Sequence, residues 1–411
     1  MAGPTVTAYN AGVGQPIYAG YWPGGRLSGG VLLDNTTPAG GLLTQQSMLS
    51  GVVQLDSVAP VGTVQGYITP AWMVGKPLNE WFTIPGTSGA GGAAATAFSG
   101  MALRDDTSEI YVAAAGGHND SSDNRVVSLD LRQDAPTWVL RIAPSTSVQI
   151  DVPYYADGKP SSRHTYHTAH WVAGRNRVML SGSPATYGSP SYFDDVVGFN
   201  VTTNTWDAAN TFANVPVSSY GAARDNNGNI LSVLGWRKWS QATDTYSALM
   251  SPPGNETTQV RFPWAYDSSR DQWFGLAWAD GQGFTSWGST LRAVKISNTG
   301  LTQVSVTFNS SAALTQLAAD QPVYAGMVYD VGNDRFLFYA SGAGRQSTIY
   351  VVTPNAGTTW DVSILSLGGG SVTPTTVDVA GILGRFRYVP QLNGVVALTT
   401  IAANLYFMRL S

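Results

Sequence analysis

A repeated pair of short strands joined by a polar turn is the feature of this 411-residue sequence that most restricts its fold. From about residue 97 onward, apolar runs rich in Val, Ile, Tyr, Phe and Trp are bounded by Gly, Asn and Asp, which is typical of strands and tight turns. Ile230 and Trp273 hold equivalent places 43 residues apart, whereas Ile110 and Val178 are 68 apart, so loops of varied length separate the copies. The six aligned positions are Ile110, Val178, Ile230, Trp273, Phe336 and Val395.

This spacing is close to the period of the four-stranded blades of a β-propeller, lengthened by insertions. The last copy ends with the run Leu405–Leu410, a third strand with no fourth strand after it. The segment Glu80–Ile84, which contains Trp81, could supply that fourth strand from the other end and so remove an exposed edge. We therefore expect an all-β propeller over residues 77–411, with six blades, or seven if one copy is too degenerate to recognise. A strand near Trp81 would close the ring.

Residues 1–76 differ from the rest because they are almost uncharged. Up to Gly75 the charged residues are Arg26, Asp34 and Asp56. A floppy arm is one interpretation, but the apolar content is high for a solvated linker, and such a segment would be sticky if exposed. We favour an attachment or oligomerisation arm that is buried against copies of this chain or other subunits.

The composition excludes several classes of protein. There is no Cys, so disulfides, a thiol nucleophile and Cys-ligated zinc are ruled out. Only 12% of the residues are charged and the formal net charge is −4, which argues against nucleic-acid binding through phosphate contacts. No apolar run approaches the ~18 residues that span a bilayer, so no membrane insertion is expected. The start Met-Ala-Gly-Pro-Thr lacks the features of a signal peptide, and no phosphate or dinucleotide loop is present, so no cofactor is expected.

All four histidines lie within the first two copies of the repeat. His118 follows Gly116-Gly117, whereas His164, His167 and His170 lie in the run Ser162–His170. If that run is a strand, His164, Tyr166 and His170 share one face, and Arg163 and His167 share the other. Adjacent blades would then bring His118 near the segment from Arg163 to Tyr166.

The repeats resemble the kelch repeat, in which a Gly pair follows the second strand and a Trp follows the third. The Gly pair is intact at Gly116-Gly117, and Trp138, Trp206 and Trp360 occupy the Trp position. Residues 97–206 further resemble a bacterial and phage-associated group of kelch-like propellers. The motifs that carry this likeness are Gly116-Gly117-His118, Asn124, Leu129-Asp130-Leu131, Ser162-Arg163-His164-Thr165-Tyr166 and the closing Gly384-Arg385-Phe386-Arg387-Tyr388-Val389-Pro390.

There is also a distant resemblance to propeller-fold polysaccharide lyases, which implies a chemistry for this cluster. Arg163 would neutralise a uronate carboxylate, and His118, His164 and Tyr166 would be the catalytic groups that transfer protons. The competing interpretation is structural, with these side chains joining one blade to the next. His164, His167 and His170 do not have helical zinc spacing, so no metal site is assigned.

A second set of residues could bind sugars. Trp236, Lys238 and Trp239 follow a Gly in an expected loop, where the two rings could stack on a glycan. His167 and His170 are further candidate binding residues. Packing of the same tryptophans in the core is the competing interpretation.

Three functions remain open on these observations. The first is a virion structural protein of a phage, in a tail fibre, a spike or a head decoration, whose propeller recognises a host-surface glycan or other receptor. In that case the arm contacts other virion subunits or copies of itself. The alternative is an enzyme, a lyase or hydrolase of acidic polysaccharide. The third is a scaffold without a ligand. We expect location in the virion, or a secreted or cell-surface location in bacteria if a signal was removed.

Overall fold

The computed structural model describes residues 6–9, 16–19 and 69–411, apart from 93–97, 119, 184, 189–192, 215–220, 233–235, 249–262, 281–282, 286–289, 323, 342–343 and 378–380. The chain divides into two compact units, Met1–Tyr67 and Ile68–Ser411. In the first unit, β1 (Val6–Tyr9) pairs antiparallel with β2 (Pro16–Ala19). The rest of the arm expected over residues 1–76, up to Ile68, lies outside the described residues.

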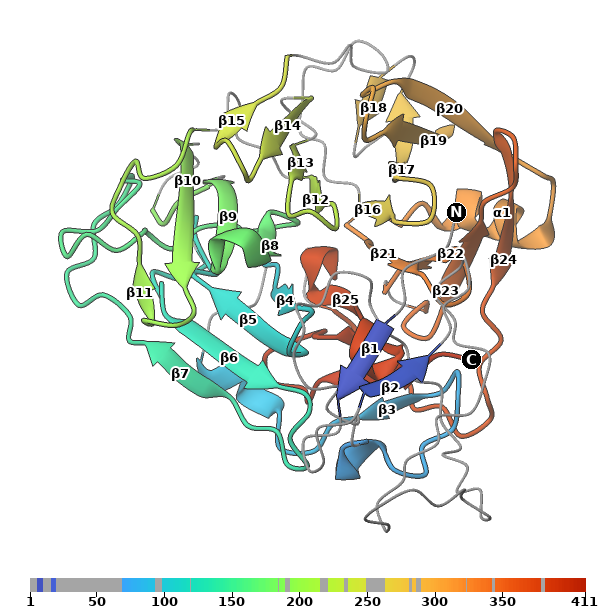
Figure 1. Ribbon diagram of the computed structural model, residues 1–411, viewed down its shortest axis with the longest axis horizontal. Helices are drawn as coiled ribbons and strands as arrows, with labels where there is room; N and C mark the ends of the chain where they lie inside the picture. The colour runs from blue at the N-terminus through green and yellow to red at the C-terminus, as the bar shows by residue number, and fades with distance from the viewer. Residues whose placement is uncertain are drawn as a thin grey trace. The chain divides into compact units, whose positions relative to one another are not determined.

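The second unit is all-β and contains a propeller-like ring of four-stranded antiparallel sheets around a common centre (Figure 1). Three of these sheets follow chain order from the strand nearest the centre to the outermost strand. They are β4 (Ala102–Arg104), β5 (Glu109–Ala113), β6 (Val126–Asp130) and β7 (Val139–Ile142); β8 (Ala169–Val172), β9 (Arg177–Ser183), β10 (Phe193–Asn200) and β11 (Thr205–Trp206); and β12 (Ala222–Arg224), β13 (Ile230–Ser232), β14 (Arg237–Ser240) and β15 (Thr245–Tyr246).

The fourth four-stranded sheet joins the two ends of the second unit. It contains β25 (Phe386–Val389), β26 (Gly394–Ala397), β27 (Tyr406–Arg409) and β3 (Trp81–Thr83), in that order. Met408 pairs with Trp81 and Tyr406 with Thr83, in antiparallel register. The predicted pairing of the strand near Trp81 with the last strand of the chain is therefore confirmed.

A larger, nine-stranded sheet completes the second unit. It consists of two antiparallel runs joined in parallel at two residue pairs, Thr307 with Thr359 and Phe308 with Trp360. The innermost strands of the runs, β16 (Trp264–Asp267) and β21 (Gly326–Asp330), also contact each other, so this sheet nearly closes on itself. Among the described residues the expected six blades are thus seen as four separate sheets and one joined sheet. The runs are β16 (Trp264–Asp267), β17 (Gln272–Asp280), β19 (Thr290–Ser297) and β20 (Gln303–Phe308), with β18 (Gly283–Thr285) on β17; and β21 (Gly326–Asp330), β22 (Arg335–Tyr339), β23 (Ile349–Thr353) and β24 (Thr359–Ile364).

Short helices occupy the connections. The helix α1 (Ala312–Asp320) links the two runs of the joined sheet and is capped by Ser311, whose Oγ accepts a hydrogen bond from the Leu314 N–H at 3.0 Å. Single 3₁₀ turns are η1 (Ala71–Met73), η3 (Ala173–Arg175), η4 (Leu383–Arg385) and η5 (Pro390–Leu392). The segment η2 (Ser88–Gly92) is kinked, because Gly89, Ala90 and Gly91 have positive φ.

The apolar core lies between neighbouring sheets. Tyr111 and Val126 of the first sheet pack with Trp171 and Phe199 of the second. Trp72 of η1 packs against Phe82 and Phe407 and is buried, although residues 69–76 were expected to belong to the arm. The second unit, which starts at Ile68, thus begins earlier in the chain than expected.

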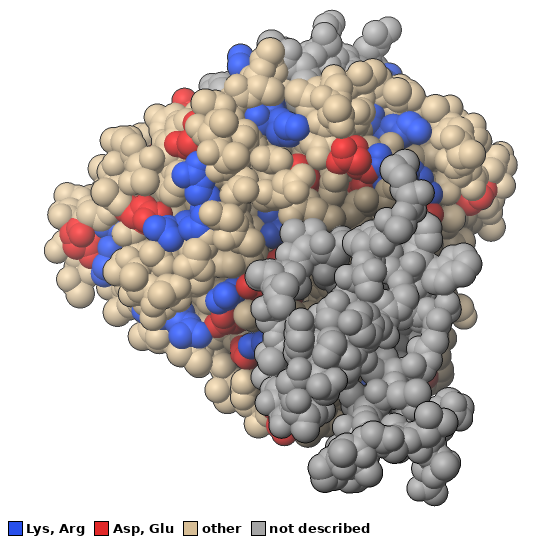
Figure 2. Space-filling model, in the orientation of Figure 1, with Lys and Arg blue, Asp and Glu red and all other residues tan. Residues whose placement is uncertain are grey.

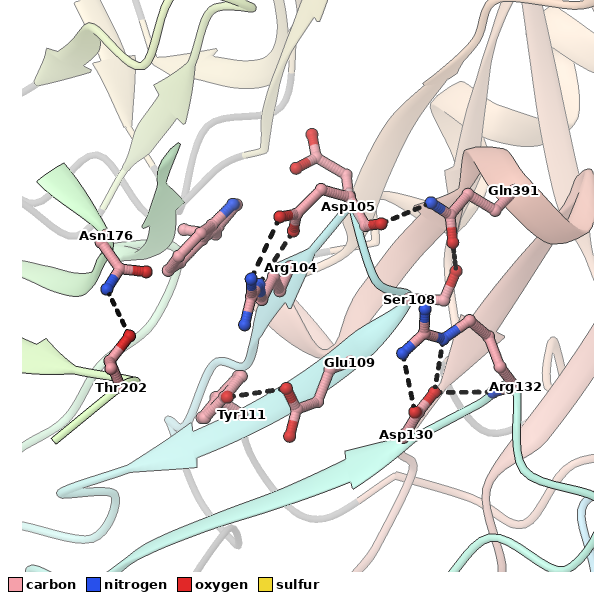
Figure 3. A network of polar contacts seen from close by, with 12 residues as sticks. Arg104, Asp105, Ser108, Glu109, Tyr111, Asp130, Arg132, Asn176, Thr202 and Gln391 are labelled. Carbon is pink, nitrogen blue, oxygen red and sulfur yellow. Dashed lines mark hydrogen bonds and ion pairs between the residues drawn. The ribbon is translucent and has the colours of Figure 1, made fainter. Parts of the chain in front are cut away.

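Polar contacts at the turns also hold neighbouring sheets together (Figure 3). Gln391 of η5 donates from Nε2 to the Asp106 carbonyl at 2.6 Å and accepts from Ser108 Oγ at 2.8 Å, which ties the fourth sheet to the first. The Arg104 guanidinium pairs with Asp106 and lies over the Trp171 ring, 4.8 Å from its centroid. On the face drawn in Figure 2, charged residues stand in small mixed groups among wide uncharged areas.

Candidate functional site

Gly116 and Gly117 let the loop after β5 touch the segment that enters the second sheet. A Cβ on Gly117 would lie 2.4 Å from the Ala185 carbonyl oxygen and 2.6 Å from Arg163 Cα, and the φ of Gly117 is +80°. The Gly117 N–H donates to Ser162 Oγ at 2.9 Å. Because only glycine fits this close approach, the Gly pair and the Ser162–Tyr166 motif are two sides of one contact.

The segment Ser162–Tyr166 is a loop, which corrects the expected strand. The Arg163 N–H donates to the Ala114 carbonyl at 3.0 Å and the Tyr166 N–H to the Phe98 carbonyl at 2.8 Å. Tyr166 has a φ of +36°, outside the strand region, so the alternation of faces predicted for this run does not hold. The strand β8 begins only at Ala169.

His164 is the centre of a hydrogen-bonded relay. Its Nε2 lies 2.8 Å from Asp120 Oδ2, and its Nδ1 lies 3.1 Å from the Tyr166 hydroxyl oxygen. A carboxylate only accepts, so Nε2 carries the proton given to Asp120, and Nδ1 accepts from the Tyr166 hydroxyl. This arrangement can pass the Tyr166 proton to His164 while Asp120 stabilises the imidazolium that forms.

Aromatic rings surround this relay. Phe98 stacks on His164 with ring centroids 4.6 Å apart, and the His118 ring lies 5.9 Å from the His164 ring. The prediction that neighbouring sheets bring His118 near the 163–166 segment is therefore confirmed. His164 and Tyr166 are only 4% and 2% exposed, while His118 is half-buried and Asp120 is exposed, so the surface presents His118 and Asp120.

Arg163 does not have the position that neutralising a substrate would need. Its guanidinium is fully buried, pairs with Asp195 at 2.9 Å and also donates to the carbonyls of Ser161 and Pro153. The expected role for Arg163 is thus corrected: the side chain joins the segment before β8 to β10. A buried pair of this kind is costly to break, because each charge depends on the other.

His167 and His170 lie near the centre of the second unit and are almost fully buried. Burial, and next the charge of Arg387, lowers the pKa of His167 to about 3. The same two causes, with Arg224 and His167, lower the pKa of His170 well below its usual range. In the part of the chain that the structure describes, the Nε2 atoms of both rings have no hydrogen-bond partner. Both histidines are therefore neutral, and neither offers a surface for a sugar.

The expected sugar-stacking set belongs to the core. Trp236 and Trp239 are 3% and 2% exposed, and Trp236 packs edge-on against Trp264. The Trp239 indole N–H donates to Asp244 at 2.8 Å. The Lys238 ammonium donates to the carbonyl and side chain of Asn298. None of these three side chains is placed to stack on a ligand at the surface.

Sequence reasoning missed Asp120, Phe98 and Arg387. Asp120 was visible two residues after His118, but a single carboxylate in a polar turn is ordinary. Phe98 and Arg387 enter the argument only once residues far apart in the chain are brought together.

Among the described residues, no group of three or more His, Asp or Glu is arranged to hold a metal ion. None of the helices in the described ranges combines the length and apolar character needed to cross a membrane.

Comparison with known proteins adds little to this picture. No protein-family model matches the sequence, and no curated protein matches it. One similar solved structure is a chain from "Crystal Structure of Mitotic Checkpoint Complex", with 8% sequence identity and a TM-score of 0.40 over 86% of this chain and 99% of that one. A likeness of this strength bears on neither function nor ligand.

Proposed function

We propose that this chain is a virion structural protein of a phage, in a tail fibre, spike or head decoration, whose propeller recognises a host-surface glycan or other receptor. The observation that carries the proposal is the division into two compact units, of which the first is nearly uncharged. A segment with three charges in 75 residues is suited to burial against other virion subunits or copies of itself.

The propeller of this proposal has six kelch-like blades. The nine-stranded sheet then counts as two blades whose outer strands, β20 and β24, are joined at only two residue pairs. Within each run the strands pair antiparallel, as the strands of the four separate sheets do. This supports counting the two runs as two blades.

The surface offered to a receptor includes His118 and Asp120, since both are at least partly exposed on a loop that the Gly116-Gly117 contact fixes in place. Beneath them, His164 and Tyr166 hold Asp120 through the relay. A loop held by such a scaffold loses little conformational freedom on binding.

The relay also favours a second candidate, an acidic-polysaccharide lyase in which Tyr166 and His164 move the proton. Arg163 cannot serve it, because its charge is already paired with Asp195. The two candidates are compatible, since a recognition module can also cleave the glycan that it binds.

The experiment compares the full chain with residues 68–411. We expect the full chain to form oligomers or to join virions, and the shorter chain to stay monomeric by light scattering while still binding the same glycans on an array. His118→Ala should weaken that binding at least several-fold, and Thr202→Ala, on an exposed turn of the second sheet, should not. Equal assembly of both chains would contradict the role of the arm.

The same glycans, incubated with the protein, separate the two candidates. Ultraviolet absorbance of an unsaturated uronate, abolished in His164→Ala and Tyr166→Phe, would support the lyase. Binding without such a product would support recognition alone.

A further inference from the structure

Arg387 reaches across the centre of the second unit. It lies on β25, and its Nε donates to the Met101 carbonyl at 2.8 Å, just before β4. Its Nη2 donates to the Ala169 carbonyl at 3.0 Å, at the start of β8. These three strands are the innermost of their sheets and lie around the centre in Figure 1. Arg387 therefore places a positive charge where three sheets converge.

That charge has no counter-ion within the described part of the chain. Arg387 forms no ion pair there, whereas Arg163, which is fully buried, is paired with Asp195. The charge that acts on Arg387 is that of another arginine, Arg224, whose own guanidinium is paired with Asp105. Burial, and next Arg224, lowers the pKa of Arg387 to about 10, and it remains protonated at neutral pH. One positive charge is left uncompensated.

Two buried ring nitrogens lie in the same region. Within the described residues, the Nε2 atoms of His167 and His170 have no hydrogen-bond partner, and His170 directly follows Ala169, whose carbonyl accepts from Arg387. The charge of Arg387 acts on both rings. Buried polar atoms are rarely left without partners, and a bound ion or water is a common partner where the protein supplies none. A neutral imidazole can donate from one ring nitrogen and accept at the other, so it can face an anion or a water bound to it.

We propose that the centre of the ring holds a small monovalent anion, of the size of chloride or formate, against Arg387 and the Nε2 edges of His167 and His170. One uncompensated positive charge calls for one negative charge. The backbone packs closely on one side of the guanidinium, since a Cβ on Gly384 would lie 3.2 Å from Arg387 Nη2, and this favours a small anion. The anion would neutralise the charge that three sheets share and so stabilise the ring. This site is separate from the proposed receptor surface.

The test is thermal unfolding of the full chain at neutral pH and constant ionic strength, with chloride replacing the bulky anion gluconate. Binding to the folded state should raise the melting temperature saturably, by about 2–4 °C near saturation, and formate should do the same. Arg387→Gln should lose this dependence. Arg409→Gln is the matched control, because Arg409 likewise donates to a carbonyl and has no carboxylate partner among the described residues, and it lies in the outer half of its sheet.

A rise that is the same in Arg387→Gln and wild type, or that does not saturate, would overturn the proposal. If Arg387→Gln does not fold, chloride-35 nuclear magnetic resonance on the wild-type chain decides. Line broadening that formate reverses supports the site, and no broadening beyond that of a buffer control overturns it. Because the assay measures neither receptor binding nor assembly, its failure leaves the proposed function standing.

Discussion

At the scale of single residues, partners decide what a buried polar side chain does. Arg163 and Arg387 both join neighbouring segments, yet the first is neutralised by Asp195, while within the described ranges the second meets only carbonyl oxygens. The sequence predicted that His118 and His164 come together, because the repeat places both at the junction of two neighbouring sheets. It could not assign Arg163, because nothing in the pattern around Asp195 marks that carboxylate as its partner.

The buried histidines make the protein sensitive to acid. The pKa of His167 falls from 6.5 to about 3 on folding, so between these values the unfolded chain binds a proton that the folded chain does not. Stability should therefore fall as the pH drops below 6.5, by about 1.4 kcal/mol per pH unit for this residue, and His170 adds to the slope in the same direction.

Urea unfolding between neutral pH and about pH 5 measures this effect before the carboxylates begin to titrate. His167→Gln should flatten the dependence of the unfolding free energy on pH. His118→Gln, at a half-buried histidine on the loop after β5, is the control and should leave the slope closer to wild type. Equal slopes in all three proteins would contradict the assignment.

At the scale of elements, the local pattern of residues predicted the strands, and the repeat along the chain predicted some of their pairing partners. Runs rich in β-branched and aromatic residues predicted most of the strands, and the missing fourth strand predicted that the strand near Trp81 pairs with the last strand of the chain. The run from Ser162 was predicted wrongly, because the positive φ of Tyr166 and the contact with Gly117 depend on a neighbouring sheet. The joining of β20 to β24 has no counterpart in the other repeats and could not be predicted.

That junction gives a test of the six-blade count. Thr307 pairs with β24 and not with β19, whose pairing with β20 ends at Val306. Thr307→Pro removes the N–H that donates to the Thr358 carbonyl at 2.8 Å. If the junction only links two complete blades, the unfolding free energy should fall by about 1–2 kcal/mol, with an unchanged circular dichroism spectrum. Thr302→Pro, in the turn before β20, is the control for a proline on this edge. Loss of the whole fold in Thr307→Pro alone would contradict two separate blades.

At the scale of the whole molecule, the ring makes distant residues neighbours, and this is the information that local patterns lack. Arg387 meets Met101 and Ala169 only because β25 and β4 become adjacent when the ends of the second unit share a sheet. Closure also buries Trp81 completely, with its ring 5.5 Å from that of Tyr339 in the joined sheet. One short strand thus supports contacts on both sides of the junction.

The stability of the ring should therefore depend strongly on β3, although this strand is short. Residues 69–411 should fold as the full chain does, whereas residues 86–411 should aggregate or unfold at much lower urea, because the edge of β27 is left open and the space of Trp81 is empty. In the full chain, Trp81→Ala should lower the free energy of unfolding by about 3–5 kcal/mol, and Val139→Ala on the exposed face of β7 should lower it little.

The shortened chain can also be tested by adding back the missing strand. A synthetic peptide of residues 78–86, added to residues 86–411, should restore solubility by taking the place of β3. Equal stability of the two shortened chains would show that the ring closes without this strand.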